Sequence, residues 1–301
     1  MPRGRAGTTP RSGVLTLALT AVVALVVTGC GSGSGGGTAA DCDTSRGTLV
    51  VGLVAPLTGE LASVGLGMKN SADLAIKEAN DRCAVPGYHL AIQSQDDRAD
   101  PRTGAAAART LAGDPSLIGV LGPFNSSVAL EMQRVLADAS IVEISPGTTA
   151  VQLTRGSNPV TAPLRQYQSF FRTVATDAVQ GPAAAAYMAE QADRRRVAVV
   201  SDGKTYGEGI ASEFGKQLAT VGGTVVTRLQ LPPEASPAAA VGAIARSRPD
   251  AVFYGGEYPG AGPLSRALGA AGVTAPVMGG DGIVNPGYVA AGGREGDLGT
   301  S

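Results

Sequence analysis

From residue 48 onward, short apolar runs alternate with stretches whose apolar residues recur at helical spacing, and this order admits few folds. The run TLVVGLVA at residues 48–55 is apolar almost throughout, as is typical of strands buried on both faces of a parallel sheet. Residues 68–79 then repeat their apolar positions with the period of a helix that buries one face. A strand, a helix and another strand in succession predict parallel strands joined by helices, the doubly wound α/β class.

The alternation occurs in two series. A polar stretch at residues 154–168 separates them, and the junction is predicted near residues 171–177. The predicted strands of the first series are TLVVGLVA, YHLAIQSQD, LIGVLG and IVEIS, and those of the second are RVAVVSD, GTVVTRLQL, DAVFYGG and APVMGGDG. We therefore expect two similar lobes, residues 47–174 and 175–296, with a hinged cleft between them. A hydrophobic content of 44% supplies enough apolar side chains for two cores.

Residues 1–29 have the pattern of a bacterial lipoprotein signal peptide. Basic residues precede an apolar run at residues 14–27, which is too short to cross a bilayer core of roughly 30 Å as a helix. The run ends in VTGC, so Cys30 stands where a lipobox cysteine is diacylated, and residues 30–46 form a flexible tether rich in Gly and Ser. The pattern predicts an exported protein, lipid-anchored to the outer face of the bacterial cell membrane. An ordinary signal peptide followed by an unmodified cysteine is the alternative.

Two further cysteines, Cys42 and Cys83, remain in a chain that is expected to reach an oxidising compartment. Cys42 lies just before the first predicted strand, and Cys83 lies just after the helix that runs back along it. Both therefore fall at the same end of the first lobe, which favours a disulfide between them. Two free thiols are the alternative.

The sequence argues against an enzyme and against nucleic acid as a partner. A net charge of −1 provides no basic field for nucleic acid. The single histidine, His89, excludes a site with two histidine ligands and disfavours a Ser-His-Asp triad. Gly203-Lys204-Thr205 resembles the end of a phosphate-binding loop, but Ala198 stands where that loop needs a glycine. We expect no catalytic residues, no cofactor and no metal.

The sequence GVLGPFNSSVALEM at residues 119–132 places polar residues where a predicted strand gives way to a helix. Asn125, Ser126 and Ser127 are suited to capping, because their side chains accept hydrogen bonds from the first N–H groups of a helix. The same N–H groups and hydroxyls can hold an anion at the positive end of the helix dipole. The two interpretations are compatible with each other.

A series of motifs runs through the chain in a consistent order: VGLVAPLTGELASVG, DDRADP, ISPGTTA, DAVQGP, TYGEG, DAVFYGGEYPGAG and VMGGDG. Together they resemble the solute-binding proteins of branched-chain amino acid ABC transporters, which have the type I periplasmic-binding fold. The resemblance covers nearly everything between residues 48 and 296. It implies capture of a small amino acid, branched-chain or related, between two lobes and its delivery to ABC permease subunits. A ligand-sensing domain of the same fold, regulated by an amide or an amino acid, is the alternative.

The resemblance also implies roles for particular residues. Ser126 falls where relatives bind the α-carboxylate of the ligand, and Gly147 and Thr149 fall where they contact the amino-acid head. Tyr206 falls on the aromatic residue of the second lobe that closes over the ligand, and Asp281 falls on the carboxylate that pairs with the ammonium. The ligand-binding residues implied in this way are Phe124, Asn125, Ser126, Gly147, Thr149, Tyr206, Glu257 and Asp281.

Three features depart from the family pattern. Val64 in the first lobe and Glu257 in the second stand where well-known relatives carry tyrosine. Glu257 either brings a second carboxylate to the cleft beside Asp281, which would favour a ligand with more positive charge, or faces solvent. In the family the chain crosses back to the first lobe after the position of GREGDLGTS, so residues 297–301 are expected to begin a return crossover that is cut short. The first lobe would then expose apolar surface that the return segment covers.

Overall fold

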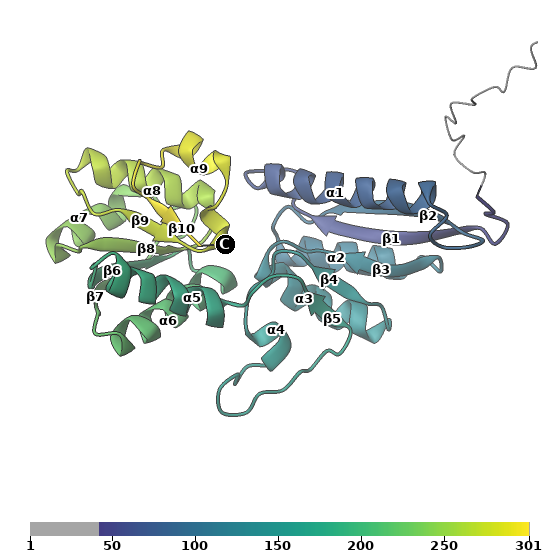
Figure 1. The fold of residues 1–301 in the computed structure, drawn as a ribbon, viewed down its shortest axis with the longest axis horizontal. Helices are drawn as coiled ribbons and strands as arrows, with labels where there is room; N and C mark the ends of the chain where they lie inside the picture. Colours follow the sequence, from purple (N-terminus) through teal and green to yellow (C-terminus); the bar gives the residue numbers. More distant parts are fainter. Residues whose placement is uncertain (1–41, 301) are drawn as a thin grey trace, which may run out of the picture. The chain divides into compact units, whose positions relative to one another are not determined.

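The structure, a computed structural model, describes residues 42–300. The predicted signal peptide, Cys30 and the first part of the predicted tether lie outside the described residues. The described strands form two five-stranded sheets in which neighbouring strands are parallel. This confirms the predicted α/β class with two lobes (Figure 1). No helix between residues 42 and 300 is long enough and apolar enough to cross a membrane.

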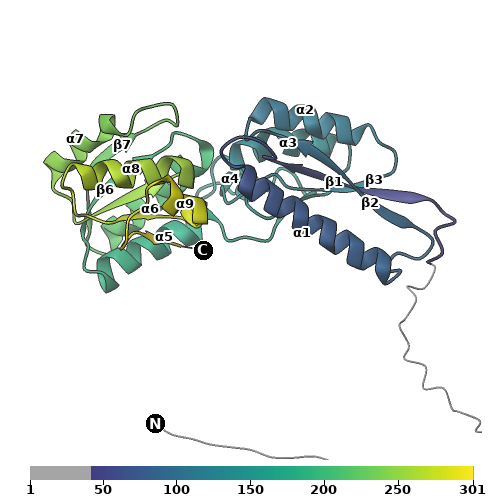
Figure 2. The same cartoon turned by 90° about the horizontal axis from the view of Figure 1, so that it is seen from above.

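The first sheet has the strand order β2-β1-β3-β4-β5. Its strands are β1 (Thr48–Ala55), β2 (His89–Asp96), β3 (Leu117–Leu121), β4 (Glu143–Ser145) and β5 (Phe170–Arg172). The helices of this lobe are α1 (Ala62–Asp81), α2 (Pro101–Ala112), α3 (Ser126–Asp138) and the short α4 (Gln152–Arg155). Helix α1 lies on one face of the sheet, and α2 and α3 lie on the other (Figures 1 and 2).

The core of the first lobe lies between its sheet and the helices α2 and α3. Val54 of β1 and Val120 of β3 are buried in one cluster with Leu111 of α2 and Met132 of α3. Helix α2 begins as the sequence predicts, because the Asp100 carboxylate accepts a hydrogen bond of 2.8 Å from the backbone N–H of the third helical residue. The start of α2 thus depends on neighbouring residues, whereas the core of the lobe is formed by residues that are far apart in the chain.

The second sheet has the strand order β10-β9-β8-β6-β7. Its strands are β6 (Arg196–Ser201), β7 (Thr224–Gln230), β8 (Ala251–Gly255), β9 (Val277–Gly279) and β10 (Leu298–Gly299). Its helices are α5 (Asp177–Ala186), which continues into the π-helical turn η1 (Tyr187–Gln191), α6 (Thr205–Thr220), α7 (Ala238–Ser247), α8 (Tyr258–Ala270), the 3₁₀ turn η2 (Asp281–Ile283) and α9 (Pro286–Ala291).

The second sheet is buried on both faces. Along β6, Val197 and Val199 pack into the cluster formed with α5 and α6, whereas the alternating Ala198 and Val200 pack into the cluster formed with α7 and α8. Phe214 of α6 stacks on Phe253 of β8 with ring centroids 3.9 Å apart. The strands in this part of the sequence are therefore continuously apolar because both of their faces are buried.

The chain passes from the first sheet to the helices of the second between β5 and α5. Strand β5 ends at Arg172 and α5 begins at Asp177, so the chain changes lobe within the predicted segment. At the other end, β10 pairs with β9 through Leu298 opposite Met278. The second sheet therefore extends beyond residue 296, where we had expected the second lobe to end.

Cys42 and Cys83 form a disulfide with Cα atoms 5.5 Å apart. Cys42 precedes β1, and Cys83 follows the end of α1. The bond therefore ties the start of the first strand to the end of the helix that covers it, and the alternative of two free thiols does not occur.

Candidate functional site

The predicted ligand-binding residues lie where strands of both sheets end. In doubly wound sheets, the carboxyl ends of the strands are where ligands bind. The site comprises loops that follow β3 and β4 in the first lobe and β6, β8 and β9 in the second. One cavity, which we call the interlobe cavity, is lined by Phe124, Asn125, Ser126, Gly147, Tyr206, Glu257, Asp281 and Gly282.

Seven of the eight residues implied by the family resemblance are thus brought to one cavity. The eighth, Thr149, is fully buried two residues along the chain from Gly147 and does not line the cavity. Gly147 is held to glycine by its surroundings, because a Cβ atom there would lie 2.5 Å from the ring of Phe124. The backbone of this segment can therefore approach the cavity more closely than one with a side chain could.

The start of α3 differs from the capping interpretation. No side chain accepts a hydrogen bond from the first turn of the helix. Asn125 instead donates from Nδ2 to Oε1 of Glu257 at 2.8 Å, and the Ser126 Oγ accepts from the backbone N–H of Ala150 at 3.2 Å. Simple capping is therefore wrong here, because tertiary partners take the groups that would have served as caps.

In the second lobe, Tyr206 and Asp281 form one hydrogen-bonded unit. The Tyr206 hydroxyl donates to Oδ1 of Asp281 at 2.8 Å and accepts from the backbone N–H of Gly282 at 3.1 Å. Burial raises the pKa of Tyr206 well above its usual value, so the hydroxyl keeps its proton. Burial also raises the pKa of Asp281, while the bond from Tyr206 opposes that change. Gln180 fixes the loop by accepting the backbone N–H of Asp281 at 3.1 Å.

Glu257 lies inside the site and does not face solvent, which settles the alternative left open by the sequence. The residue is 6% exposed and directly precedes α8. Its Oε2 atom lies 3.0 Å from Nζ of Lys204, and its Oε1 accepts from Asn125. Two carboxylates, Glu257 and Asp281, therefore line the same cavity, as one of the two interpretations required.

Asp202 lies at the end of β6, behind Glu257, and is 3% exposed. Its Oδ1 accepts the backbone N–H of Lys204 at 2.9 Å, whereas Oδ2 has no partner. Burial, together with the nearby charge of Glu257, raises the pKa of Asp202 to about 7. Burial lowers the pKa of Lys204, but the two carboxylates outweigh it and raise that pKa above its usual value, so the ammonium stays charged.

The interlobe cavity is small in this conformation. Its volume is about 10 Å³, close to the least that holds one water molecule. The first lobe contributes to this tight packing, because Val64 and Phe124 contact the core cluster of the second lobe. A ligand the size of an amino acid therefore needs the lobes to move apart, or side chains such as Glu257 to rotate, before it can enter.

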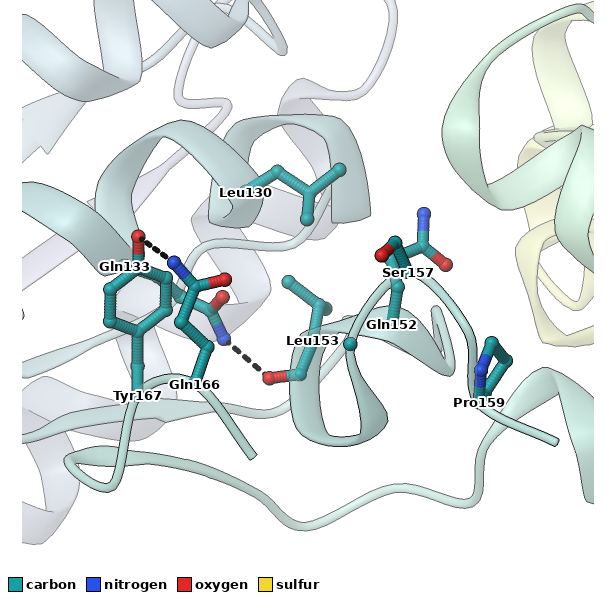
Figure 3. A pocket seen from close by; sticks show the side chains of 9 residues that line it. Leu130, Gln133, Gln152, Leu153, Ser157, Pro159, Gln166 and Tyr167 are labelled. Carbon is teal, nitrogen blue, oxygen red and sulfur yellow. Dashed lines mark hydrogen bonds between the residues drawn. The ribbon is translucent and has the colours of Figure 1, made fainter. Parts of the chain in front are cut away.

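A larger hollow lies elsewhere in the first lobe, beside α4 and the polar stretch that follows it (Figure 3). Its volume is about 530 Å³, and three glutamine side chains contribute to its wall. Gln133 donates to the carbonyl of Leu153, and Gln166 donates to the hydroxyl of Tyr167. None of the predicted ligand residues lines it, and its lining includes no charged side chain.

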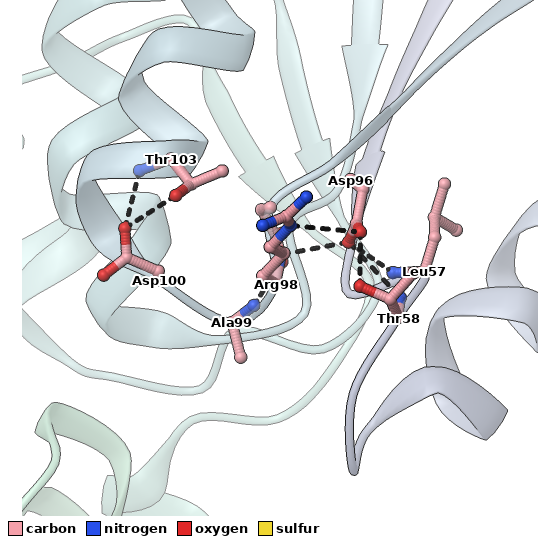
Figure 4. A network of polar contacts seen from close by, with 8 residues as sticks. Leu57, Thr58, Asp96, Arg98, Ala99, Asp100 and Thr103 are labelled. Atoms are coloured by element: carbon pink, nitrogen blue, oxygen red, sulfur yellow. Dashed lines mark hydrogen bonds and ion pairs between the residues drawn. The ribbon is translucent and has the colours of Figure 1, made fainter.

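The acidic motif DDRADP has a local structural role (Figure 4). The Asp96 carboxylate accepts from the backbone N–H of Leu57 at 2.9 Å and from the hydroxyl of Thr58 at 2.6 Å. Asp97 accepts the backbone N–H of Ala99 at 2.8 Å. The motif therefore fixes the loop between β1 and α1, which leads to Val64 at the lobe interface.

Sequence reasoning missed Asp202, Lys204 and Gln180 as members of the site. Lys204 was considered only as part of a phosphate-binding loop, which the sequence then excluded. The available signal for Asp202 and Lys204 was position, because Asp202 ends the predicted strand RVAVVSD and Lys204 follows it, at the edge where ligands bind. In the described part of the chain, no group of three or more His, Cys, Asp or Glu residues is arranged to hold a metal ion.

The sequence matches a known protein family over most of its length. A family profile described as periplasmic binding protein matches residues 48–298. The Leu/Ile/Val-binding protein BraC3 of Rhizobium johnstonii is 33% identical over 245 residues, which are 81% of this chain and 64% of that protein. The Leu/Ile/Val-binding protein homolog 1 of Brucella abortus is 33% identical over 239 residues, 79% of this chain and 62% of that protein. The chain thus spans less than two thirds of the length of these relatives.

Solved structures share the fold at lower identity. A branched-chain amino acid transporter substrate-binding protein from Streptococcus pneumoniae, in complex with isoleucine, has a TM-score of 0.73 and 23% identity, over 81% of this chain and 67% of that one. A solute-binding protein of an ABC transporter from R. palustris, in complex with benzoate, has a TM-score of 0.70 and 22% identity, over 81% and 65%. Isoleucine and benzoate differ in chemistry, so this fold alone does not fix a ligand.

Proposed function

Because the chain belongs to the periplasmic binding protein family, we propose that it is an extracytoplasmic solute-binding protein and not an enzyme. It captures a small amino acid, branched-chain or related, between its two lobes and delivers it to the permease subunits of an ABC transporter. Relatives named for binding leucine, isoleucine and valine support the amino-acid class. A signal peptide and a lipid on Cys30 would hold the protein at the outer face of the bacterial cell membrane.

The interlobe cavity is the observation that carries this proposal. An amino acid presents a carboxylate and an ammonium group close together, and each needs partners of opposite polarity. The cavity offers the N-terminal end of α3 at Ser126 for the carboxylate. It offers Asp281 for the ammonium. Gly147 and Tyr206 complete the enclosure.

Binding would act through the hinge between the lobes. Ser126 and Gly147 belong to the first lobe, and Tyr206 and Asp281 belong to the second, so a ligand that contacts all four stabilises the closed form. The hydrogen bond between Asn125 and Glu257 joins the two lobes directly. The ligand would replace part of this contact, and the closed form would then present both lobes to the permease.

Calorimetric titration of the full chain tests the amino-acid class. The panel contains leucine, isoleucine, valine, a set of polar and charged amino acids, and small amides. We expect at least one amino acid to bind with its zwitterion intact, so that its amide or its deaminated analogue binds far more weakly. No heat of binding from any amino acid would reject the proposal.

Two variants test the assignment of the ligand's charged ends. Asp281→Asn leaves a buried ammonium without its counter-charge, which costs about 3–5 kcal/mol, or roughly a hundredfold or more in affinity. Ser126→Ala removes one of several donors to the carboxylate and costs about 1.5–3 kcal/mol. Glu234→Gln, on an exposed loop of the second lobe, is the control and leaves affinity unchanged. Intact binding by Asp281→Asn would show that the ammonium is held elsewhere.

A further inference from the structure

A second cavity adjoins the interlobe cavity, and Glu257 lines both of them. Its volume is about 70 Å³, which is more than one water molecule requires. Its charged lining residues are Glu60, Asp202, Glu257 and Lys204. We call it the acidic cavity, because it gathers three carboxylates around one ammonium group.

One buried oxygen in this group lacks a partner. Asp202 is almost completely buried, its Oδ1 is bonded to the backbone of Lys204, and its Oδ2 accepts nothing. On the other side of Glu257, the Oδ1 atom of Asn125 is also buried and accepts nothing. Buried polar atoms normally have partners, so two acceptors without them, on either side of Glu257, point to a missing donor.

The charges of the lining residues also favour a ligand group that donates hydrogen bonds and carries positive charge. Lys204 is already engaged with Glu257 at 3.0 Å, and its presence offsets one carboxylate only. An anionic side chain placed here would meet the like charge of Glu257. Asp202, whose pKa is raised to about 7, is partly protonated near neutral pH, and a cationic side chain would give its Oδ2 a donor and favour its ionised form.

We propose that the ligand is an amino acid whose side chain ends in an ammonium or guanidinium group, bound between Glu257 and the Oδ2 atom of Asp202. This inference rests on the proposed function, because it assumes that the α-carboxylate and α-ammonium are held in the interlobe cavity. Glu257 then acts as the specificity-determining residue of the side-chain end of the site. Its rotation away from Asn125 opens the acidic cavity to the interlobe cavity.

An aliphatic side chain is disfavoured in the same place. It would bury the Glu257–Lys204 pair against methyl groups and leave Asp202 Oδ2 without a donor. Burying polar groups in this state costs free energy, and specificity often arises from such penalties against the wrong ligand.

The test is a competition of side chains on the full chain by calorimetric titration. Lysine, ornithine and arginine form the cationic set, leucine and isoleucine form the aliphatic set, and glutamate is the anionic probe. We expect the best cationic ligand to bind at least tenfold more tightly than leucine, and glutamate to give no heat. Leucine binding more tightly than every cationic ligand would overturn the inference while leaving the proposed function intact. Silence from all three sets would reject both.

Variants separate a direct role from a structural one. Asp202→Asn keeps the shape of the side chain and its acceptor for the backbone of Lys204, so the fold is expected to persist. For this variant we measure the ratio of the affinity for lysine to the affinity for leucine. The ratio should be at least fivefold lower than in the original protein. Glu257→Gln should lower the same ratio, with thermal melting used to check that the protein remains folded. An unchanged ratio in both folded variants would contradict the assignment, and Glu190→Gln, in the exposed part of η1, serves as the matched control away from the cavities.

Discussion

The two sheets are built from the same kind of apolar strand but are covered differently. The second sheet has helices packed on both faces, and Phe253 of β8 is completely buried. The first sheet has α2 and α3 on one face, while α1 is the only helix between residues 42 and 300 that lies on the other (Figure 2). On that face Ile144 is 36% exposed and Phe171 is 46% exposed.

A hollow marks the uncovered part of the first sheet. Its volume is about 390 Å³, and its walls include Leu53, Met68, Leu121 and Ile144. Exposed apolar patches of this kind are unusual on soluble domains and tend to associate. The comparison shows that an apolar run in the sequence predicts a strand but not the burial of both its faces. That burial depends on which helices pack on the sheet.

The largest effect that would sharpen this comparison is expected in the second core. Phe253→Ala removes a ring that stacks on Phe214, and such changes in a close-packed core cost about 3–5 kcal/mol. Chemical denaturation followed by circular dichroism measures the loss. Phe171→Ala in the first sheet is the matched variant, with an expected cost below about 1 kcal/mol. Equal costs would contradict the difference in coverage.

The disulfide should matter to the first lobe by an intermediate amount. Cys42→Ser removes a bond that closes a loop with a sequence separation of 41 residues, and losses of this kind cost about 2–4 kcal/mol. Because the bond ties β1 to α1, hydrogen exchange should quicken in these two elements and not in the second sheet. Faster exchange in β6 and β8 instead would show that the lobes unfold as one unit.

A smaller effect depends on pH. Burial raises the pKa of Asp177 at the start of α5 to about 7 from its ordinary 3.8. The folded protein therefore binds this proton more tightly than the unfolded chain, so stability falls as the pH rises between about 4 and 7. Asp177→Asn should be more stable than the original protein by about 1–2 kcal/mol at pH 8 and equal to it near pH 4.

The measurement for this prediction is urea denaturation at several pH values. Asp138→Asn, an exposed carboxylate on the first lobe, is the control and should give the same difference at every pH. A constant difference for Asp177→Asn as well would mean that its carboxylate is solvated in the folded state.

The smallest effect on stability is expected on the uncovered face. Ile144→Thr should change the free energy of unfolding by less than about 0.5 kcal/mol, because its side chain gains little from burial. It should nevertheless reduce binding of a hydrophobic dye and self-association measured by light scattering. Val200→Thr, a buried change in the second sheet, should destabilise the protein without reducing dye binding.

Much of the fold could be predicted because its signals are local. The apolar run at Thr48–Ala55 and the cap at Asp100 describe structure that involves only neighbouring residues, and both occur as expected. Serine and asparagine at the start of α3 failed as caps for the opposite reason. Asn125 donates to Glu257, and Ser126 accepts from the backbone N–H of Ala150. Both partners are distant in the sequence, so the sequence did not reveal them.

The candidate site also has features that the sequence predicts and features that depend on distant residues. The family motifs led to seven residues that line one cavity, because each motif sits at the end of a strand and the topology brings these ends together. The burial of Glu257 and its pairing with Lys204 could not be predicted, since the two residues are 53 positions apart. Sequence position left Glu257 free to face either the cavity or solvent.

The sequence by itself determined four strands of each sheet with the helices between them, the two-lobed α/β class and the strand ends where polar residues gather, but it did not predict the short edge strands β5 and β10. The predicted features depend on periodicity and on the few ways in which parallel strands can be connected. Only the tertiary structure decided which polar groups acquire partners: Asn125 bonds across to Glu257, while Oδ2 of Asp202 is left without one. The physical reason is that hydrogen bonds and desolvation depend on distances of a few ångströms between residues that the chain brings together only when it folds.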